Sequence, residues 1–181
     1  MIKSFWQKTK ESGFSLLEIV VTLSLLAVSL VAVITVATKM LQIEHVTEND
    51  FIAKGLLIEA VELAEAKRNS NVQNDLIWYL GLATSTNNGD IYSFALDYTG
   101  TTSTAGVLPD AAAQLKYDDT NFYQLSSGTA TKFYRRLIST YKKKTNVKDW
   151  LEIEAQVYWS DRGGKGNIQK LTTTIYQSQK R

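Results

Sequence analysis

The sequence of 181 residues contains no cysteine, a single histidine and a single proline. The lack of cysteine excludes disulfides, thiol nucleophiles and zinc–thiolate sites. The one histidine, His45, is predicted to lie exposed on a helix, whereas a Ser-His-Asp triad or a histidine metal site needs it inside a folded pocket. We therefore predict that the protein is not an enzyme and that it holds neither a cofactor nor a metal ion.

Formal charge is scarce over a long stretch near the N-terminus. From Phe14 to Thr38 the only charged residue is Glu18, and the other polar residues are serines and threonines. A helix needs about 20 mostly apolar residues to span a bilayer, whereas the apolar part of a secretory signal has only about 7–15. The run ends at Ala37-Thr38-Lys39-Met40, which is a poor signal-cleavage site. We predict a membrane span that stays in the mature protein.

Glu18 is an acid within this apolar run. Acids inside a span are costly and are usually functional and paired, although a residue near the end of a span can also reach the lipid headgroups. Cleavage after Gly13 would create a cationic α-amino group on Phe14, which lies four residues, or about one helical turn, before Glu18. That amino group is a natural counter-ion for the carboxylate.

Gly13-Phe14-Ser15-Leu16-Leu17-Glu18 follows three lysines and precedes the long apolar helix. This combination resembles the cleavage and methylation motif of type IV pilins and type II secretion pseudopilins. The resemblance implies that a prepilin peptidase cuts after Gly13 and methylates the new N-terminal Phe14. It also implies that Glu18 pairs with the N-terminal amine of a neighbouring subunit during filament assembly. The family usually has threonine at the position of Ser15, which keeps the hydroxyl.

Apolar residues continue beyond Lys39 at spacings of three and four, which marks one face of a helix: Ala53, Leu56, Leu57, Ala60, Leu63 and Ala64. Asn69-Ser70-Asn71 is predicted to end the helix. We expect four parts: a cleaved leader of residues 1–13, a transmembrane half-helix of residues 14–38, a stalk half-helix of residues 39–68 and a sheet domain of residues 69–181. The lysines of the leader favour a cytoplasmic N-terminus, so the sheet domain lies outside.

The remaining sequence alternates between strand-like and turn-rich segments, with Asp75–Leu82 as a short helix or packed turn and Thr99–Asp110 as a loop. Trp150–Ser160 is the clearest strand, because its apolar and polar residues alternate strictly. The expected strands are Asp90–Asp97, Gln114–Tyr117, Phe122–Leu125, Thr131–Tyr141, Trp150–Ser160 and Ile168–Gln177. The predicted class is α+β, with a long N-terminal helix packed on a C-terminal antiparallel sheet, and the strand order resembles the PilV/GspI-type minor branch of the pilin family.

Three other patterns have competing interpretations. Asp118-Asp119-Thr120-Asn121 offers oxygen ligands for calcium, but aspartate and asparagine also simply form turns. Gly163-Gly164-Lys165-Gly166 is followed by a strand rather than a helix, so it is predicted to be a hairpin turn and not a phosphate loop. Lysine, arginine and tyrosine between Lys132 and Lys148 could contact nucleic acid, although lysines at strand ends more often protect sheet edges.

These observations predict a structural subunit, a minor pilin or pseudopilin, of a type IV pilus-like filament. The absence of the proline that major pilins often have at the position of Thr35 favours the minor class. The expected partners are membrane lipid, the prepilin peptidase, other pilin or pseudopilin subunits and an inner-membrane assembly platform. The protein would first cross the cytoplasmic membrane once and then join a filament at the cell surface. The alternative is a membrane-anchored extracellular protein that binds a ligand or DNA and never polymerises.

Overall fold

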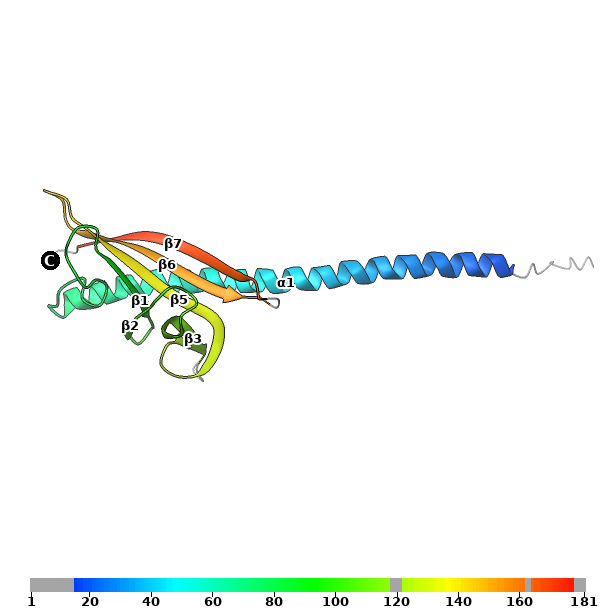
Figure 1. The fold of residues 1–181 in the computed structure, drawn as a ribbon, viewed down its shortest axis with the longest axis horizontal. Helices are drawn as coiled ribbons and strands as arrows, with labels where there is room; N and C mark the ends of the chain where they lie inside the picture. The colour runs from blue at the N-terminus through cyan, green and yellow to red at the C-terminus, as the bar shows by residue number, and fades with distance from the viewer. Residues whose placement is uncertain (1–14, 118–121, 162–163, 178–181) are drawn as a thin grey trace, which may run out of the picture. The chain divides into compact units, whose positions relative to one another are not determined.

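The computed structural model describes residues 15–117, 122–161 and 164–177. The described part contains one long helix followed by strands that form a single antiparallel sheet, which confirms the predicted α+β class (Figure 1). The elements are α1 (Leu16–Gln73), β1 (Ile91–Leu96), β2 (Thr102–Thr104), a 3-10 turn (Ala111–Ala113), β3 (Gln114–Tyr117), β4 (Tyr123–Gln124), β5 (Thr129–Lys142), β6 (Trp150–Ser160) and β7 (Gly166–Tyr176). The chain divides into two compact units, Met1–His45 and Val46–Arg181.

The second unit is built around β5, the longest strand. β6 pairs with β5 along Phe133–Lys142, and β7 pairs with β6 along its whole length. On its other side β5 pairs with β3 near its start and with β1 near its end, and β2 and β4 extend these two branches. The predicted loop Thr99–Asp110 therefore contains one short strand, β2. The predicted hairpin between β6 and β7 is confirmed, since Gly164 N–H donates to the Asp161 carbonyl at 3.0 Å.

The helix packs on the sheet through the stripe that its sequence indicated. Its residues Ala53, Leu56, Leu57, Ala60 and Ala64 are buried and belong to the same core cluster as Leu151, Ile153, Ala155, Val157 and Trp159 of β6. Leu63 is only partly buried at the edge of this core. The alternation predicted for β6 is correct except at Gln156, which is also buried. The larger core of the second unit is thus shared by the helix and the sheet, and a smaller cluster contains Ala95, Ala105 and Ala113.

The predicted helix stop at Asn69-Ser70-Asn71 is wrong, because α1 continues to Gln73. Asn71 is buried, and its amide donates to the carbonyls of Trp78 at 3.2 Å and Leu80 at 2.8 Å. Its side chain therefore fixes the following turn while its backbone stays helical. The helix ends in a Schellman-type cap: Asp75 has a φ of 58°, and Leu76 N–H donates to the Asn71 carbonyl at 2.8 Å.

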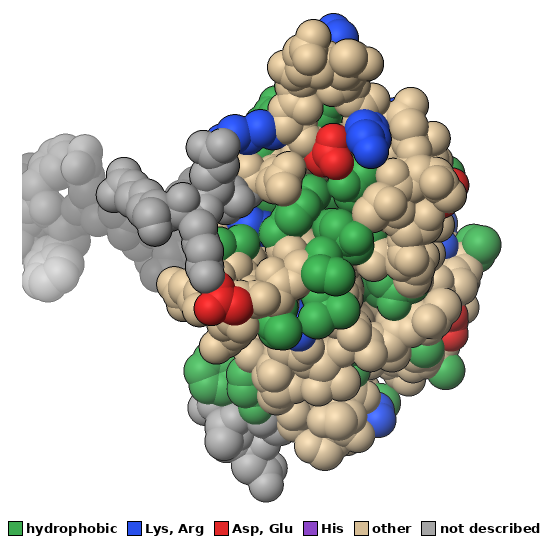
Figure 2. All heavy atoms as spheres, turned by 90° about the vertical axis from the view of Figure 1, so that its left-hand side faces the viewer, with side chains coloured by type: hydrophobic (Ala, Val, Ile, Leu, Met, Phe, Trp, Pro, Cys, Tyr) green, Lys and Arg blue, Asp and Glu red, His purple; other side chains and the backbone are tan. Residues whose placement is uncertain are grey.

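The segment after this cap forms packed turns, as predicted for Asp75–Leu82. Trp78 is buried, and its ring lies 5.6 Å from Tyr79 and 6.1 Å from Tyr141 of β5. The same segment leaves Leu76, Ile77 and Leu80 about half exposed. Figure 2 views the end of the larger unit at which α1 stops, where hydrophobic side chains gather beside basic and acidic ones.

Candidate functional site

The predicted processing site begins just before the described residues. Gly13 and Phe14 lie outside them, so cleavage and methylation there stay predictions. Ser15 is the first described residue, and its carbonyl accepts hydrogen bonds from Glu18 N–H at 2.9 Å and Ile19 N–H at 3.2 Å. Ser15 therefore stands at the helix N-terminus, where its carbonyl accepts the first hydrogen bonds of α1.

Glu18 lies in the first turn of α1, and its side chain is exposed. The first backbone N–H groups of a helix have no partner within it and carry a partial positive charge, so a carboxylate is favourable there. Glu18 therefore lies where the helix dipole favours a negative charge.

The apolar half of α1 is exposed to solvent in the described part of the chain. α1 is long and apolar enough to cross a membrane, and its most apolar stretch has no buried residue among those described. Large apolar side chains such as Leu25, Val28 and Val31 are 67%, 71% and 64% exposed. This surface needs lipid, other helices or both, because exposing it to water is unfavourable.

The hydroxyl groups in this apolar segment are satisfied within the helix. They donate to carbonyls one turn earlier: Thr22 to Glu18 at 2.9 Å, Ser24 to Val20 at 2.7 Å, Ser29 to Leu26 at 2.9 Å, Thr35 to Val31 at 2.8 Å and Thr38 to Thr35 at 3.0 Å. A polar group in hydrocarbon must find its partners inside the protein. These five hydroxyls can therefore enter lipid or a dry helix interface with their donors already paired.

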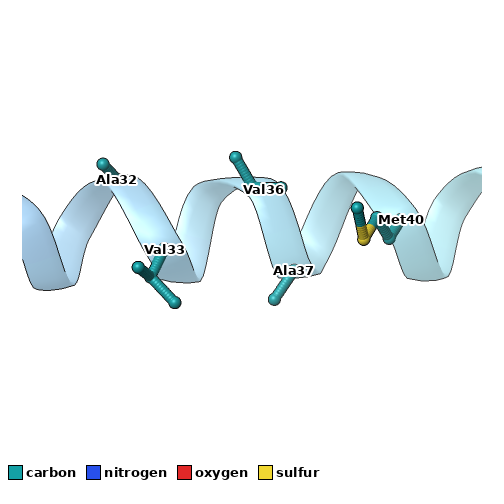
Figure 3. Close-up of a pocket in the computed structure, with 5 residues that line it drawn as sticks. All are labelled: Ala32, Val33, Val36, Ala37 and Met40. Atoms are coloured by element: carbon teal, nitrogen blue, oxygen red, sulfur yellow. The ribbon is translucent and has the colours of Figure 1, made fainter.

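The surface of the apolar half of α1 also has a shallow depression. Ala32, Val33, Val36, Ala37 and Met40 line a shallow apolar depression. Figure 3 shows Ala32 and Val36 on one side of the helix and Val33 and Ala37 on the other. Small side chains let a second helix approach closely.

The other candidate site residues from the sequence do not come together in one site within the described residues. His45 is exposed on α1, as expected, and no group of three or more His, Cys, Asp or Glu residues that could hold a metal ion occurs in residues 15–117, 122–161 and 164–177. Residues 118–121, the possible calcium ligands, lie outside that part of the chain.

The basic and aromatic residues of β5 are largely used inside the second unit. Arg135 is fully buried and pairs with Glu59 at 3.0 Å, and Arg136 Nε donates to Gln156 Oε1 at 2.8 Å. The Tyr141 hydroxyl donates to Asp149 at 2.7 Å, and burial together with this bond raises the pKa of the Tyr141 phenol. These residues hold the sheet together rather than form one open surface.

A comparison with family models finds the prokaryotic N-terminal methylation motif over residues 8–34. This motif marks the precursors of type IV pilins and pseudopilins. The chain carries a prepilin motif. The motif implies processing by a prepilin peptidase and assembly with other pilins, and it includes the segment from Gly13 to Glu18. No curated protein and no solved structure matches the chain, and the PilV/GspI-type branch stays a prediction.

Sequence reasoning missed a second apolar surface on α1. Phe51 is 79% exposed and Ile58 is 54% exposed, and Ile58 lies seven positions, or about two turns, after Phe51, so both lie on one face. The buried residues Ala53, Leu56 and Ala60 are each two positions from one of them, about 200° around the helix. Periodicity revealed the sheet-facing stripe, and a search for a second stripe at a spacing of seven would have revealed this one.

Proposed function

We propose that this prepilin-like chain is a structural subunit of a type IV pilus-like filament, as a minor pilin or pseudopilin. The observation that carries the proposal is the prepilin motif at the start of a helix whose apolar half is exposed among the described residues. Packing between helices in lipid depends on close contact and on paired polar groups rather than on hydrophobicity. The helix offers both, since the small residues Ala32 and Ala37 line its surface depression and the carboxylate of Glu18 lies in its first turn.

The mechanism is assembly. The apolar half of α1 would hold the subunit in the cytoplasmic membrane, with its N-terminus inside and residues 46–181 outside. A prepilin peptidase would cut after Gly13 and methylate Phe14. An assembly platform would then move the subunit out of the lipid into a bundle of neighbouring helices. Pairing of Glu18 with the Phe14 amine of a neighbour would neutralise both charges and set the axial position of the incoming subunit.

Mass spectrometry of the mature N-terminus tests the first step. The expected species begins with N-methylated Phe14. A mature protein that still begins at Met1 would contradict the proposal and favour a membrane-anchored binding protein that does not polymerise.

The Glu18→Ala variant tests the second step. It should stay in the membrane and keep its folded sheet, but it should enter sheared filaments poorly because the neighbour's amine loses its counter-ion. Thr22→Ala is the matched control, since Thr22 lies one turn further on the helix and its hydroxyl bonds only within α1. Incorporation of Glu18→Ala at the level of the control would rule out the pairing.

A further inference from the structure

The turn that follows α1, residues 76–80, exposes large apolar side chains, and we call it the apolar turn. Leu76, Ile77 and Leu80 are 49%, 56% and 48% exposed. Turns are usually built from glycine, proline, asparagine, aspartate and serine. A group of half-exposed aliphatic side chains in a short turn therefore marks an interaction surface.

The apolar turn is held firmly, so the exposure is a property of the fold. The Asn71 amide donates to the carbonyls of Trp78 and Leu80. Trp78 is buried, and its ring packs against those of Tyr79 and Tyr141. The turn thus buries its tryptophan and presents its leucine and isoleucine side chains outward.

A basic connection lies at the same end of the second unit. Residues 143–148, between β5 and β6, are all exposed, and we call them the basic loop: they include Lys143, Lys144, Val147 and Lys148. The three lysine side chains form no hydrogen bond or ion pair with any described residue. Their charges are therefore available to a partner.

Tyr141 connects the apolar turn with the basic loop. Its ring centroid lies 5.6 Å from that of Tyr79 and 6.1 Å from that of Trp78. Its hydroxyl donates to Asp149, the residue that follows the basic loop, at 2.7 Å. One side chain thus contacts the turn and the base of the loop, and Figure 2 shows hydrophobic and basic side chains together at this end.

The acids near the basic loop do not cancel its charge. Asp149 accepts the hydrogen bond from Tyr141, and Asp90 accepts one from the Asn87 amide at 3.1 Å. Residues 143–149 contain three lysines and one aspartate, so their formal charge is 3 − 1 = +2. The surface therefore combines exposed aliphatic side chains with a net positive charge.

This surface lies at the end of the second unit that is far from the entry of the chain. The unit begins at Val46, and α1 ends at Gln73 just before the apolar turn. The helix between these two residues is about 40 Å long at 1.5 Å per residue. A partner is therefore met on the outer side of the unit.

We propose that the apolar turn and the basic loop dock on the anionic surface of a second membrane. Aliphatic side chains gain free energy by entering the boundary between headgroups and acyl chains, and lysines beside them are attracted to anionic headgroups. The apolar turn has no cation of its own and follows Asp75, so the attraction comes from the basic loop. Docking of this kind needs no polymerisation, so the inference goes beyond the proposed function.

The side-chain types favour lipid over two other partners. Single-stranded nucleic acid is bound by exposed aromatic rings on which bases stack, whereas the apolar turn exposes leucine and isoleucine. Protein interfaces are enriched in arginine and depleted in lysine, whereas every cation of the basic loop is a lysine. Aliphatic side chains beside lysines are typical of segments that lie on a membrane surface.

Vesicle flotation tests the docking with the full-length chain held in phosphatidylcholine nanodiscs. The vesicles consist of phosphatidylcholine with or without phosphatidylglycerol. The leader lysines Lys3, Lys8 and Lys10 are changed to glutamine in every sample, so that they do not attract the vesicles. The nanodiscs should float with the anionic vesicles and not with the neutral ones, and added salt should release them. Equal flotation with both kinds of vesicle would overturn the proposal.

Lys143→Gln combined with Lys144→Gln tests the basic loop. A lysine close to an anionic membrane strengthens binding about fivefold, so this double variant should bind the anionic vesicles about 20-fold more weakly. Lys132→Gln combined with Lys165→Gln is the matched control, because these exposed lysines lie at the opposite ends of β5 and β7 from the basic loop. Equal binding by the two double variants would overturn the role of the loop.

Ile77→Ser tests the apolar turn. This variant should bind the anionic vesicles about threefold more weakly, because less apolar surface enters the lipid, and its thermal unfolding should match that of wild type. Ile168→Ser is the matched control, since Ile168 is 48% exposed near the start of β7. Equal binding by the two serine variants would show that the turn does not enter lipid. If Ile77→Ser unfolds, the lysine variants decide, because those side chains have no partner within the described residues.

Two further outcomes would assign the surface to a different partner. Release of the nanodiscs from anionic vesicles by a single-stranded oligonucleotide, with Ile77→Ser behaving as wild type, would favour nucleic acid and overturn the choice of lipid. Association of the nanodiscs with one another instead of with vesicles, lost in Ile77→Ser, would favour a second copy of the chain.

Discussion

Glu59→Ala should destabilise the unit of residues 46–181 more than Arg135→Met, although the two side chains form one ion pair. Arg135 Nη1 lies 3.0 Å from Glu59 Oε1, and the arginine side chain is fully buried whereas that of Glu59 is 35% exposed. Arg135 Nη2 also donates to the Leu96 carbonyl at 2.9 Å, but its buried Nε has no partner in the described part of the chain. The cost of losing water therefore falls mainly on the arginine.

These contacts set the expected magnitudes. Removing one partner of a buried ion pair costs about 3–5 kcal/mol, because the other charge stays buried and uncompensated. Because Glu59 is partly exposed, water can partly solvate the Arg135 charge once the carboxylate is removed. Glu59→Ala should therefore cost about 2–3 kcal/mol, less than removing a partner from a fully buried pair. Arg135→Met removes the buried charge and the unpaired Nε, and it leaves Glu59 free to take up water. Replacing buried ionic groups by apolar ones is often neutral, but here the buried Leu96 carbonyl also loses its donor, so this variant should cost about 1 kcal/mol.

Urea unfolding of a soluble fragment that begins at Lys39 measures both effects, with an unchanged denaturant slope as the sign of a pure stability change. The double variant should be about as stable as Arg135→Met alone, since Glu59 has lost its partner. Glu62→Ala is the control, because Glu62 is an exposed acid on the same helix and such changes usually stay within about 0.5 kcal/mol. Arg135→Met costing as much as Glu59→Ala would refute the reasoning.

Two further predictions concern the sheet. Trp159 is 3% exposed in the shared core, so Trp159→Ala should lower the free energy of unfolding by about 3–5 kcal/mol in the same assay. Tyr158→Ala should cost less, because Tyr158 lies on the opposite face against Tyr134; equal losses would contradict the assignment of faces. A hydrogen bond from Gln156 lowers the pKa of Glu154, so its contribution to stability is present above the ordinary carboxyl pKa and is lost as the pH falls through the lowered value. The free energy of unfolding, measured from neutral to acid pH, should therefore fall less steeply for Glu154→Gln than for wild type. If the two proteins lose stability in parallel as the pH falls, Glu154 contributes nothing.

Features that depend on neighbours in sequence were predictable. The prepilin motif is a matter of spacing between Gly13 and Glu18, and the long helix follows from an apolar run without glycine or proline before Gly55. The inward face of β6 follows from its alternation, because successive side chains of a strand point to opposite faces. The stripe from Ala53 to Ala64 follows in the same way from the helical period. These properties are set by local backbone geometry, so the sequence by itself determined them.

Features that depend on distant residues were decided only by the tertiary structure. Asn71 resembles a helix stop, but the carbonyls of Trp78 and Leu80 occupy its amide, so its backbone is free to remain helical. Arg135 resembles part of an open basic region, but Glu59 compensates its charge from 76 positions earlier in the chain and allows it to be buried. Whether a polar side chain caps, pairs or stays in water depends on which partner the fold brings to it. That choice is made by packing and not by sequence spacing.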